Sequence, residues 1–454
     1  MDKNKKNRSN ISRREFLRRL GLGAGSAMAL VALEPFSAFA RDEKLKVAEN
    51  RMTYRVQHGT GEQISLLGFG MMRLPDNQEE VNQLVDYAIE HGVNYFDTAP
   101  MYMRGRSEVL TGNALSRYPR DKYVVATKMS NQNQRMWSLE DSKKMYYQSF
   151  QRLKVDYIDY YLLHSIGGGG VDNVKGRFID NGLLDFLLEE RKAGRIRHLG
   201  FSYHGDVRAF DWLLDHNDEY HWDFVQIQMN YLDWRHASLG DGWKKDADAE
   251  YLYNKCQKLD IQCVVMEPLR GGALAKLQKS QSEQLKAVRP NDSEARWAFR
   301  WVGSHTNILT ALSGMNRMDH LIDNVETFSP LDPCTESENA LLANLADVMS
   351  GFPTIPCTTC AYCMPCPYGV DIPKNFAYYN EAINEHILPL PDSGSPDYAA
   401  RKQQFIDGYK VALPDEKTWA RACQDCEECL SKCPQQIRIP NQMGRIVETL
   451  RKRG

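Results

Sequence analysis

The run Tyr157-Ile158-Asp159-Tyr160-Tyr161-Leu162-Leu163-His164 is a short segment of aromatic and aliphatic residues that ends in a polar side chain. This composition is typical of a β-strand. The amphipathic stretch Leu139–Leu153 precedes the run and a second one, Leu183–Ala193, follows it. Alternation of strand and helix in this way predicts parallel strands joined by crossover helices.

The alternation extends from about residue 50 to about residue 330. Seven further strand-like runs belong to it: Ser65–Met71, Val93–Asp97, Tyr123–Lys128, Ile196–Ser202, Phe224–Met229, Ile261–Glu267 and Ile308–Gly314. Eight strands over roughly 260 residues fit an α/β fold of the (β/α)8 TIM-barrel type. The segment Tyr54–Leu67, with Gly59-Thr60-Gly61 in its middle, predicts a β-hairpin that plugs the N-terminal end of the barrel. A doubly wound open sheet is the alternative, although no G-x-G-x-x-G opens a helix after the first strand.

Polar residues follow the strands at the end where chemistry occurs in such barrels. Asp97, Lys128 and His164 end the second, third and fourth runs, and Tyr102 follows on the loop after Asp97. A tyrosine hydroxyl can donate a proton to a developing alkoxide, and a neighbouring lysine should lower the tyrosine's pKa from about 10. The aspartate can hold the lysine, and the histidine can polarise a carbonyl oxygen. These four residues are therefore the predicted catalytic residues for carbonyl reduction.

Three segments around these residues resemble the aldo-keto reductase family. They are Phe96–Tyr102 with Gly105–Glu108 and Gly112, then Ala126–Lys128, then Asp156–His164. The resemblance extends from roughly Tyr54 to Val325. It implies a (β/α)8 barrel that reduces carbonyls with NADP or NAD, in which Asp97, Tyr102, Lys128 and His164 form the catalytic tetrad.

The resemblance also implies which residues hold the nicotinamide cofactor. From the nicotinamide end to the adenosine end they are Ser202, Gln226, Leu269, Gly271, Ser313, Gly314, Arg317 and Asn324. The loop Pro268–Gly272 resembles the one whose backbone amides receive the pyrophosphate. Two positions depart from the family pattern. Met266-Glu267 replaces an aromatic ring, and Asn316 replaces a residue that often binds the 2′-phosphate.

Eight of the eleven cysteines fall into two runs near the C-terminal end. They are Cys357, Cys360, Cys363 and Cys366, followed by Cys423, Cys426, Cys429 and Cys433, and each run ends in Cys-Pro. The second spacing is that of bacterial ferredoxins, and the first is one residue shorter in its last gap. The sequence therefore predicts two [4Fe–4S] clusters, with disulfides or zinc as the alternatives. In two-cluster ferredoxins the fourth cysteine of a run serves the other cluster, so Cys433 would join the first run and Cys366 the second.

The first 40 residues have the pattern of an export signal. Arg13-Arg14 lies in the polar start, an apolar run follows from Gly21 to Leu33, and Ala38-Phe39-Ala40 resembles a cleavage site. The paired arginines resemble a twin-arginine signal. We therefore expect a periplasmic or otherwise exported protein. An amphipathic N-terminal helix is the alternative.

Composition and length predict a globular protein with more than one domain. Of the 454 residues, 42% are hydrophobic and 26% are charged, which is ordinary for globular proteins. The net charge of -2 gives no reason to expect a nucleic-acid partner. No segment after the signal has the roughly 18 apolar residues of a membrane helix. We expect a signal peptide over 1–40, the barrel over 50–335 and a mainly α-helical ferredoxin-type domain over 350–454.

These features favour an exported oxidoreductase that interconverts a carbonyl and an alcohol, with the clusters for electron transfer. Its expected partners are a small carbonyl or alcohol substrate and a redox protein. Two alternatives remain: an electron-transfer protein with the barrel as a docking scaffold, and a barrel reductase with purely structural clusters. Nicotinamide transfers a hydride whereas a cluster transfers single electrons, and no flavin site is recognisable in the sequence to connect them.

Overall fold

Eight parallel strands form a closed barrel in the computed structural model, which describes residues 51–237, 247–389 and 397–451. The strands are β3 (Leu67–Gly70), β4 (Tyr95–Asp97), β5 (Val124–Met129), β6 (Ile158–Ile166), β7 (Ile196–Tyr203), β8 (Phe224–Gln228), β9 (Gln262–Met266) and β10 (Ile308–Ser313). Pairing of β10 with β3, for example Ala311 with Leu67, closes the barrel and excludes an open sheet. The predicted fold and all eight predicted strands are confirmed. The export-signal prediction lies outside the described residues.

A hairpin covers one end of the barrel, as predicted. Its strands β1 (Tyr54–Val56) and β2 (Gln63–Ser65) pair antiparallel. Gly59 and Gly61 have φ angles of 83° and 76°, which suit glycine in the connecting turn. Ile64 on β2 is fully buried and packs with the interior residues Tyr95 and Tyr160 near the starts of their strands. The other end, where the strands finish, is therefore the barrel's mouth.

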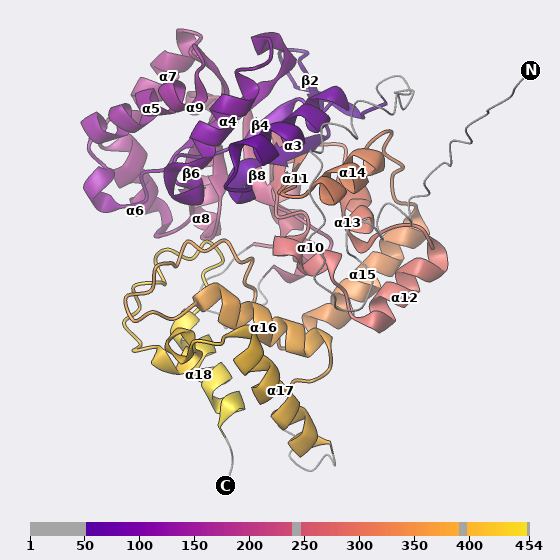
Figure 1. Ribbon diagram of the computed structural model, residues 1–454. Helices are drawn as coiled ribbons and strands as arrows, with labels where there is room; N and C mark the ends of the chain where they lie inside the picture. Colours follow the sequence, from indigo (N-terminus) through magenta and orange to yellow (C-terminus); the bar gives the residue numbers. More distant parts are fainter. Residues whose placement is uncertain (1–50, 238–246, 390–396, 452–454) are drawn as a thin grey trace, which may run out of the picture. The chain divides into compact units, whose positions relative to one another are not determined.

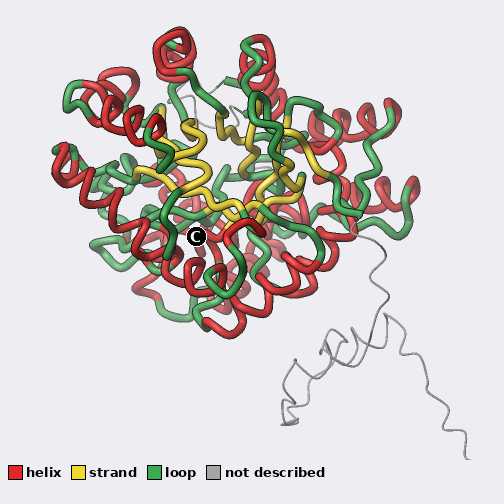
Figure 2. The backbone as a smooth tube through the Cα atoms, turned by 90° about the horizontal axis from the view of Figure 1, so that it is seen from above, coloured by secondary structure: helices red, strands yellow, loops and turns green. Residues whose placement is uncertain are grey.

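Helices surround the ring of strands, as Figure 2 shows. The principal ones on the barrel are α3 (Gln78–Glu90), α4 (Ser107–Leu115), α5 (Leu139–Leu153), α7 (Leu183–Lys192), α8 (Val207–Asp215), α11 (Ala249–Lys258), α12 (Lys279–Val288), α13 (Glu294–Gly303) and α14 (Met318–Thr327). Shorter helices are α6 (Gly170–Val174), α9 (Asn217–Tyr220) and α10 (Asp233–His236). Helix α3, for example, buries an apolar stripe that includes Val81, Leu84, Val85 and Ala88. None of the helices described is both long and apolar enough to cross a membrane.

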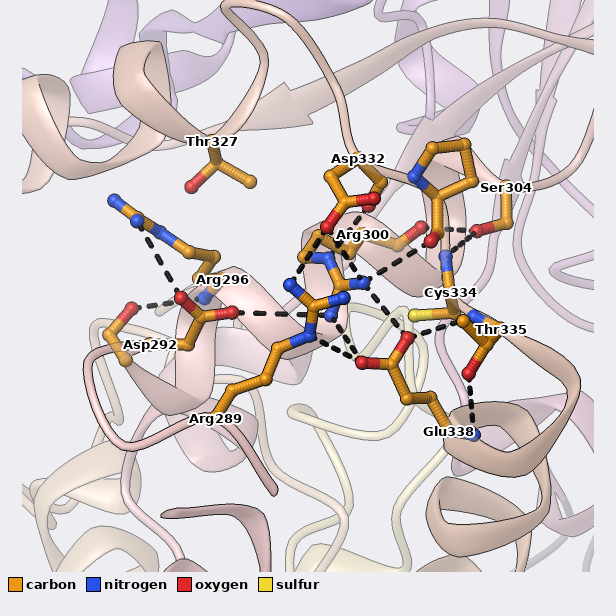
Figure 3. Close-up of polar contacts among 12 residues, drawn as sticks. Arg289, Asp292, Arg296, Arg300, Ser304, Thr327, Asp332, Cys334, Thr335 and Glu338 are labelled. Atoms are coloured by element: carbon orange, nitrogen blue, oxygen red, sulfur yellow. Dashed lines mark hydrogen bonds and ion pairs between the residues drawn. The ribbon is translucent and has the colours of Figure 1, made fainter. Parts of the chain in front are cut away.

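A charged network attaches helix α15 (Glu336–Ser350) to α13 (Figure 3). Arg300 Nη2 donates to Glu338 Oε2 at 2.9 Å, and Arg289 donates to the other carboxylate oxygen of Glu338. Glu338 also accepts a hydrogen bond from the backbone of Thr335, which completes a capping box. Since α15 is the last helix before the first cysteine run, this network fixes where the chain leaves the barrel.

The cysteine-rich segment has a helical core of its own. Helices α16 (Ile372–Asn384), α17 (Tyr398–Ala412) and α18 (Ile439–Leu450) lie together in Figure 1. Aromatic residues of the insert between the two cysteine runs fill the space among them: Phe376, Tyr378, Tyr379, Phe405, Tyr409 and Trp419. Residues 50–454, which include the barrel and this segment, form one compact unit.

We predict that Glu338→Gln lowers the free energy of unfolding by about 2–3 kcal/mol at pH 7, because two arginines lose a charged partner. Burial raises the pKa of Glu338, but hydrogen bonds from Arg300 and Arg289 outweigh it and lower the pKa to about 2. The folded-state pKa is thus below the usual 4.5, so this stabilisation is present above about pH 4.5 and is lost as the pH falls toward 2. Urea unfolding measures the difference.

Glu336→Gln is the matched control, because Glu336 lies on the same helix turn but is exposed. It should change the free energy of unfolding by less than about 0.5 kcal/mol. Equal effects of the two substitutions would show that the network does not stabilise the fold.

Candidate active site and cysteine clusters

A buried ion pair joins the ends of β4 and β5. Lys128 Nζ donates to Asp97 Oδ1 at 2.5 Å and to the Thr98 carbonyl oxygen at 2.8 Å. The two charged side chains are 0% and 3% exposed. Burial raises the pKa of Asp97 and lowers that of Lys128, and each charge opposes the shift of the other. The structure therefore brings together the predicted Lys128 and Asp97.

Tyr102 and His164 lie beside this ion pair. Lys128 Nζ is 4.9 Å from the centre of the Tyr102 ring, and the Tyr102 and His164 rings meet edge to face at 5.9 Å. Residues just after Tyr102 turn the chain sharply, with Met103 and Arg104 at positive φ. All four predicted catalytic residues thus meet at the mouth of the barrel.

The protonation of Tyr102 differs from the sequence-based expectation. We expected Lys128 to lower the pKa of Tyr102. Instead burial raises the pKa of Tyr102 well above its usual value, and Tyr362 and Asp97 raise it further. The reason is geometric: the ammonium group of Lys128 faces Asp97 and lies over the ring. At neutral pH the Tyr102 hydroxyl is therefore a proton donor.

His164 is held as a neutral imidazole. Burial lowers the pKa of His164 well below its usual value, and the positive charge of Lys128 adds to this. Its Nδ1 is 2.7 Å from Ser130 Oγ, and Arg177 Nη2 donates to its backbone carbonyl at 2.7 Å. Sequence reasoning missed Ser130 and Arg177. Ser130 follows Lys128 by two residues, but nothing in the sequence distinguishes it from other strand-end serines.

The residues expected at the nicotinamide and adenosine ends are engaged with the protein itself. Gln226 Nε2 donates to Asp97 Oδ2 at 3.2 Å, and Ser202 Oγ accepts from the backbone of Ser165 at 2.9 Å. Asn324 Nδ2 donates to Ser313 Oγ at 2.9 Å, next to Gly314. Arg317 lies apart from them, exposed and paired with Asp319.

The loop expected to receive the pyrophosphate is covered. The backbone amide of Gly271, two residues after Leu269, donates to Glu267 Oε2 at 2.5 Å. A Cβ atom at Gly271 would lie 2.6 Å from the Cα atom of Thr358, in the first cysteine run. In this arrangement the loop Pro268–Gly272 does not fit a pyrophosphate, and the contact of the remaining residues with NADP or NAD stays a prediction.

The two cysteine runs share left-handed backbone conformations at corresponding positions. Thr359 and Ala361 in the first run have φ angles of 54° and 62°, and Asp425 and Glu427 at the same places in the second have 54° and 60°. Backbone amides point at the sulfurs: the Thr359 amide is 3.4 Å from Cys357 Sγ. Amide donors of this kind favour sulfurs that carry negative charge, as in cluster ligands.

The cysteines surround two cavities. Cys357, Cys360, Cys363 and Cys433 line one cavity of about 310 Å³, and Phe376 packs against it. Cys366, Cys423, Cys426 and Cys429 line another of about 400 Å³, which Cys363 also borders. All eleven cysteines are free thiols, and no three metal-binding side chains among the described residues converge on the position of a single ion. The lining of the two cavities corresponds to the crossed ligand sets expected for two clusters.

The sequence profile of the aldo/keto reductase family matches residues 66–346, and that of the 4Fe-4S dicluster domain matches residues 356–438. The chain belongs to the aldo/keto reductase family.

Members of this family share the barrel with the chain. An aldo-keto reductase from Bacillus halodurans in its holo form is 23% identical and covers 65% of this chain and 96% of its own, with a TM-score of 0.52. A Klebsiella pneumoniae aldo/keto reductase in complex with NADP and acetate is 22% identical, with a TM-score of 0.51 and coverage of 64% and 94%. At this identity the similarity shows the fold alone.

Curated relatives match shorter segments of the chain. An uncharacterized oxidoreductase of Bacillus subtilis is 36% identical over 146 residues, 31% of this chain and 45% of the relative. L-galactose dehydrogenase of Arabidopsis thaliana is 29% identical over 160 residues, 34% and 49% of the two chains. The chain thus spans about half the length of these relatives. NADH-specific methylglyoxal reductase of Escherichia coli is 26% identical over 280 residues, 52% and 78% of the two chains.

Paired substitutions test the crossed ligand sets of this aldo/keto reductase. Cys357→Ala with Cys433→Ala should destroy one cluster and leave the other, so about half of the iron remains. Cys423→Ala with Cys433→Ala should leave each cluster one ligand short, so that no intact [4Fe–4S] signal remains. Iron analysis and electron paramagnetic resonance (EPR) after dithionite reduction distinguish the two. The reverse pattern would mean that each run holds its own cluster.

Proposed function

We propose that this protein is an exported oxidoreductase that interconverts a carbonyl and an alcohol, with Tyr102 as the acid/base and two [4Fe–4S] clusters for electron transfer. One observation carries the proposal. The hydroxyl of Tyr102 is hydrogen-bonded to Tyr362, which lies between two cluster cysteines, while its ring packs on Lys128 and His164. The reacting tyrosine is therefore shared between the barrel and the cysteine segment.

Tyr102 supplies a proton to the carbonyl oxygen as negative charge develops there. Lys128 Nζ lies over the ring of Tyr102, 4.9 Å from its centre. Asp97 keeps Lys128 charged and oriented through the 2.5 Å hydrogen bond. In the opposite direction the same residues accept the hydroxyl proton of an alcohol.

His164 acts as a neutral hydrogen-bonding group. A neutral imidazole polarises a carbonyl without placing a second full charge beside Lys128. Ser130 fixes the ring through Nδ1, and Arg177 fixes the strand end through the carbonyl oxygen of His164. These contacts support a role in orienting the substrate oxygen toward Tyr102.

Carbonyl reduction adds two electrons and two protons: Tyr102 supplies the proton on oxygen, and the proton that goes to carbon comes from solvent. The clusters, when bound, would supply the two electrons, one each. The eight cysteines of the two cavities would hold them. Because the dinucleotide residues are engaged with the protein, no step is assigned to NADP or NAD.

A small carbonyl or alcohol substrate and a redox protein are the proposed partners. The second cysteine run is open to solvent: Cys426 is exposed, as are Asp425, Glu427 and Glu428. Electrons could therefore enter or leave at this run. Export rests on Arg13-Arg14 and the apolar run after them, outside the described residues. The twin-arginine route suits a protein whose clusters are inserted before export.

Tyr102→Phe should lower kcat/KM for aldehyde reduction by a factor of about 10²–10⁴, because the proton donor is lost. The assay supplies reduced methyl viologen, a one-electron donor, and a panel of small aldehydes to the cluster-loaded protein. Tyr368→Phe is the matched control, because Tyr368 lies close to the same cysteine run but is 49% exposed. Its kcat/KM should equal that of the wild type.

The alternatives give different results in this assay. Equal rates for Tyr102→Phe and wild type would support a docking scaffold. Reduction with NADPH but not with viologen would support purely structural clusters.

A further inference from the structure

The loop Cys357–Cys363, here the mouth loop, differs from its counterpart Cys423–Cys429 in its side chains. Both have positive φ at the same two places, but Thr358 and Tyr362 of the mouth loop replace Gln424 and Glu428. Thr358 is buried and Tyr362 is half-buried, whereas Gln424 and Glu428 are exposed. A cluster alone needs only the shared backbone and cysteines, so the buried pair has another role.

Tyr362 reaches the reacting tyrosine. Its hydroxyl is a hydrogen-bond partner of the Tyr102 hydroxyl and donates to Met72 Sδ at 3.9 Å. Met72 lies in the short 3-10 helix Met71–Arg73 that follows β3. Tyr362 is thus held from the barrel side by two residues, and it lies directly between Cys360 and Cys363 in the chain.

Thr358 closes the loop that resembles a pyrophosphate site. Arg73 Nη2 donates to the Thr358 carbonyl oxygen at 2.5 Å. On its other side, Thr358 packs against Gly271, where a Cβ atom would lie 2.6 Å from its Cα atom. Two groups suited to bind a phosphate, a guanidinium and a glycine-rich loop, are therefore both covered by the mouth loop.

Glu267 occupies the remaining anion position. Its carboxylate accepts the Gly271 amide, which would otherwise point at a pyrophosphate oxygen. Glu267 has φ = 55°, a left-handed conformation that is unfavourable for this residue type. A carboxylate and a pyrophosphate carry the same sign of charge, so they cannot share the site favourably.

The second cysteine run also contacts the barrel. Gln435 Nε2 donates to Gln228 Oε1 at the end of β8 at 2.9 Å, and Gln436 Nε2 donates to the carbonyl oxygen of His204, just after β7, at 3.1 Å. These contacts lie beside Cys433, which lines the same cavity as Cys357, Cys360 and Cys363. These four cysteines line the site of the first cluster. Two separate segments of the chain, the mouth loop and the residues after Cys433, therefore attach this site to the mouth of the barrel.

We propose that the mouth loop is a fixed part of the active site, in which Tyr362 positions the Tyr102 hydroxyl, and Thr358 and Glu267 fill the place that a dinucleotide pyrophosphate would need. In this proposal the first cluster, and not a dissociating NADP or NAD, is the electron carrier next to the active site. This inference rests on the proposed function only in taking Tyr102 as the reacting residue. Its tests measure cluster spectra and dinucleotide binding. Their results do not depend on turnover, so a failed activity assay would count against the proposed function and not against this inference.

Two neighbouring glycines provide the first test. Gly271 and Gly272 have φ angles of 66° and 97°, so alanine is strained at both, but a Cβ atom at Gly272 has no neighbour within 4 Å. Gly271→Ala should displace Thr358 and change the EPR spectrum of one of the two reduced clusters. Gly272→Ala, with the same backbone strain, should give the wild-type spectrum. Identical spectra for the two variants would overturn the proposal.

Two tyrosine substitutions provide a second test, which decides the question even if Gly271→Ala fails to fold. Tyr102→Phe lies in the barrel and removes the hydroxyl that Tyr362 contacts, so it should change the same cluster signal. Tyr231→Phe is the control, because Tyr231 is a buried barrel tyrosine whose hydroxyl has no hydrogen-bond partner among the described residues. A wild-type spectrum for Tyr102→Phe would show that Tyr362 does not connect the two sites.

Equilibrium dialysis of the cluster-loaded wild type against NADPH and NADH tests the second half of the proposal. We expect no saturable binding at concentrations up to about 1 mM. Any dissociation constant would then lie above about 1 mM, which corresponds to a binding free energy weaker than about 4 kcal/mol. Binding of one dinucleotide per chain in the micromolar range would overturn the proposal.

Discussion

The buried ion pair of Lys128 and Asp97 is the interaction on which the active-site end of this barrel depends. Removing two charges from water costs several kcal/mol per ion, and their attraction compensates only where further hydrogen bonds satisfy them. Here the Thr98 carbonyl oxygen and the Gln226 amide supply those bonds. Tyr102 and His164 then pack on the pair. A pair that is costly for stability is thus positioned where its charge can assist proton transfer.

The same end of the barrel receives the cysteine segment. Lys128 lies over the ring of Tyr102, whose hydroxyl is hydrogen-bonded to Tyr362, and Tyr362 follows Cys360 by two residues in the chain. Family members such as the Klebsiella pneumoniae structure hold NADP. In this chain, Thr358 and Glu267 engage the groups that resemble the pyrophosphate site. Under the proposed function, the same fold keeps its tyrosine chemistry while the source of electrons changes.

Much of this arrangement could be predicted from the sequence. The eight strands are short runs with strong local signals, and their ends bring Asp97, Lys128 and His164 together once the barrel closes. The cysteine spacing indicated the clusters and the crossed ligand sets, which the two cavities match.

The remaining features depend on contacts between distant segments. The covering of Gly271 by Thr358 and the hydrogen bond of Tyr362 to Tyr102 join residues far apart in the chain, so no local pattern encodes them. Comparison of the two cysteine runs offered one signal, because Tyr362 stands where the second run has Glu428. The raised pKa of Tyr102 was also beyond the sequence, since it follows from burial in the folded chain and from the neighbouring Tyr362 and Asp97.

Anaerobic EPR of the cluster-loaded protein, before and after NADPH or NADH is added, tests most directly whether clusters and tyrosine form one site that uses no dissociating dinucleotide. We predict that dithionite produces reduced-cluster signals and that nicotinamide alone produces none. Reduced-cluster signals with nicotinamide alone would contradict this, because a dinucleotide would then have to bind at the mouth and pass its electrons to the clusters.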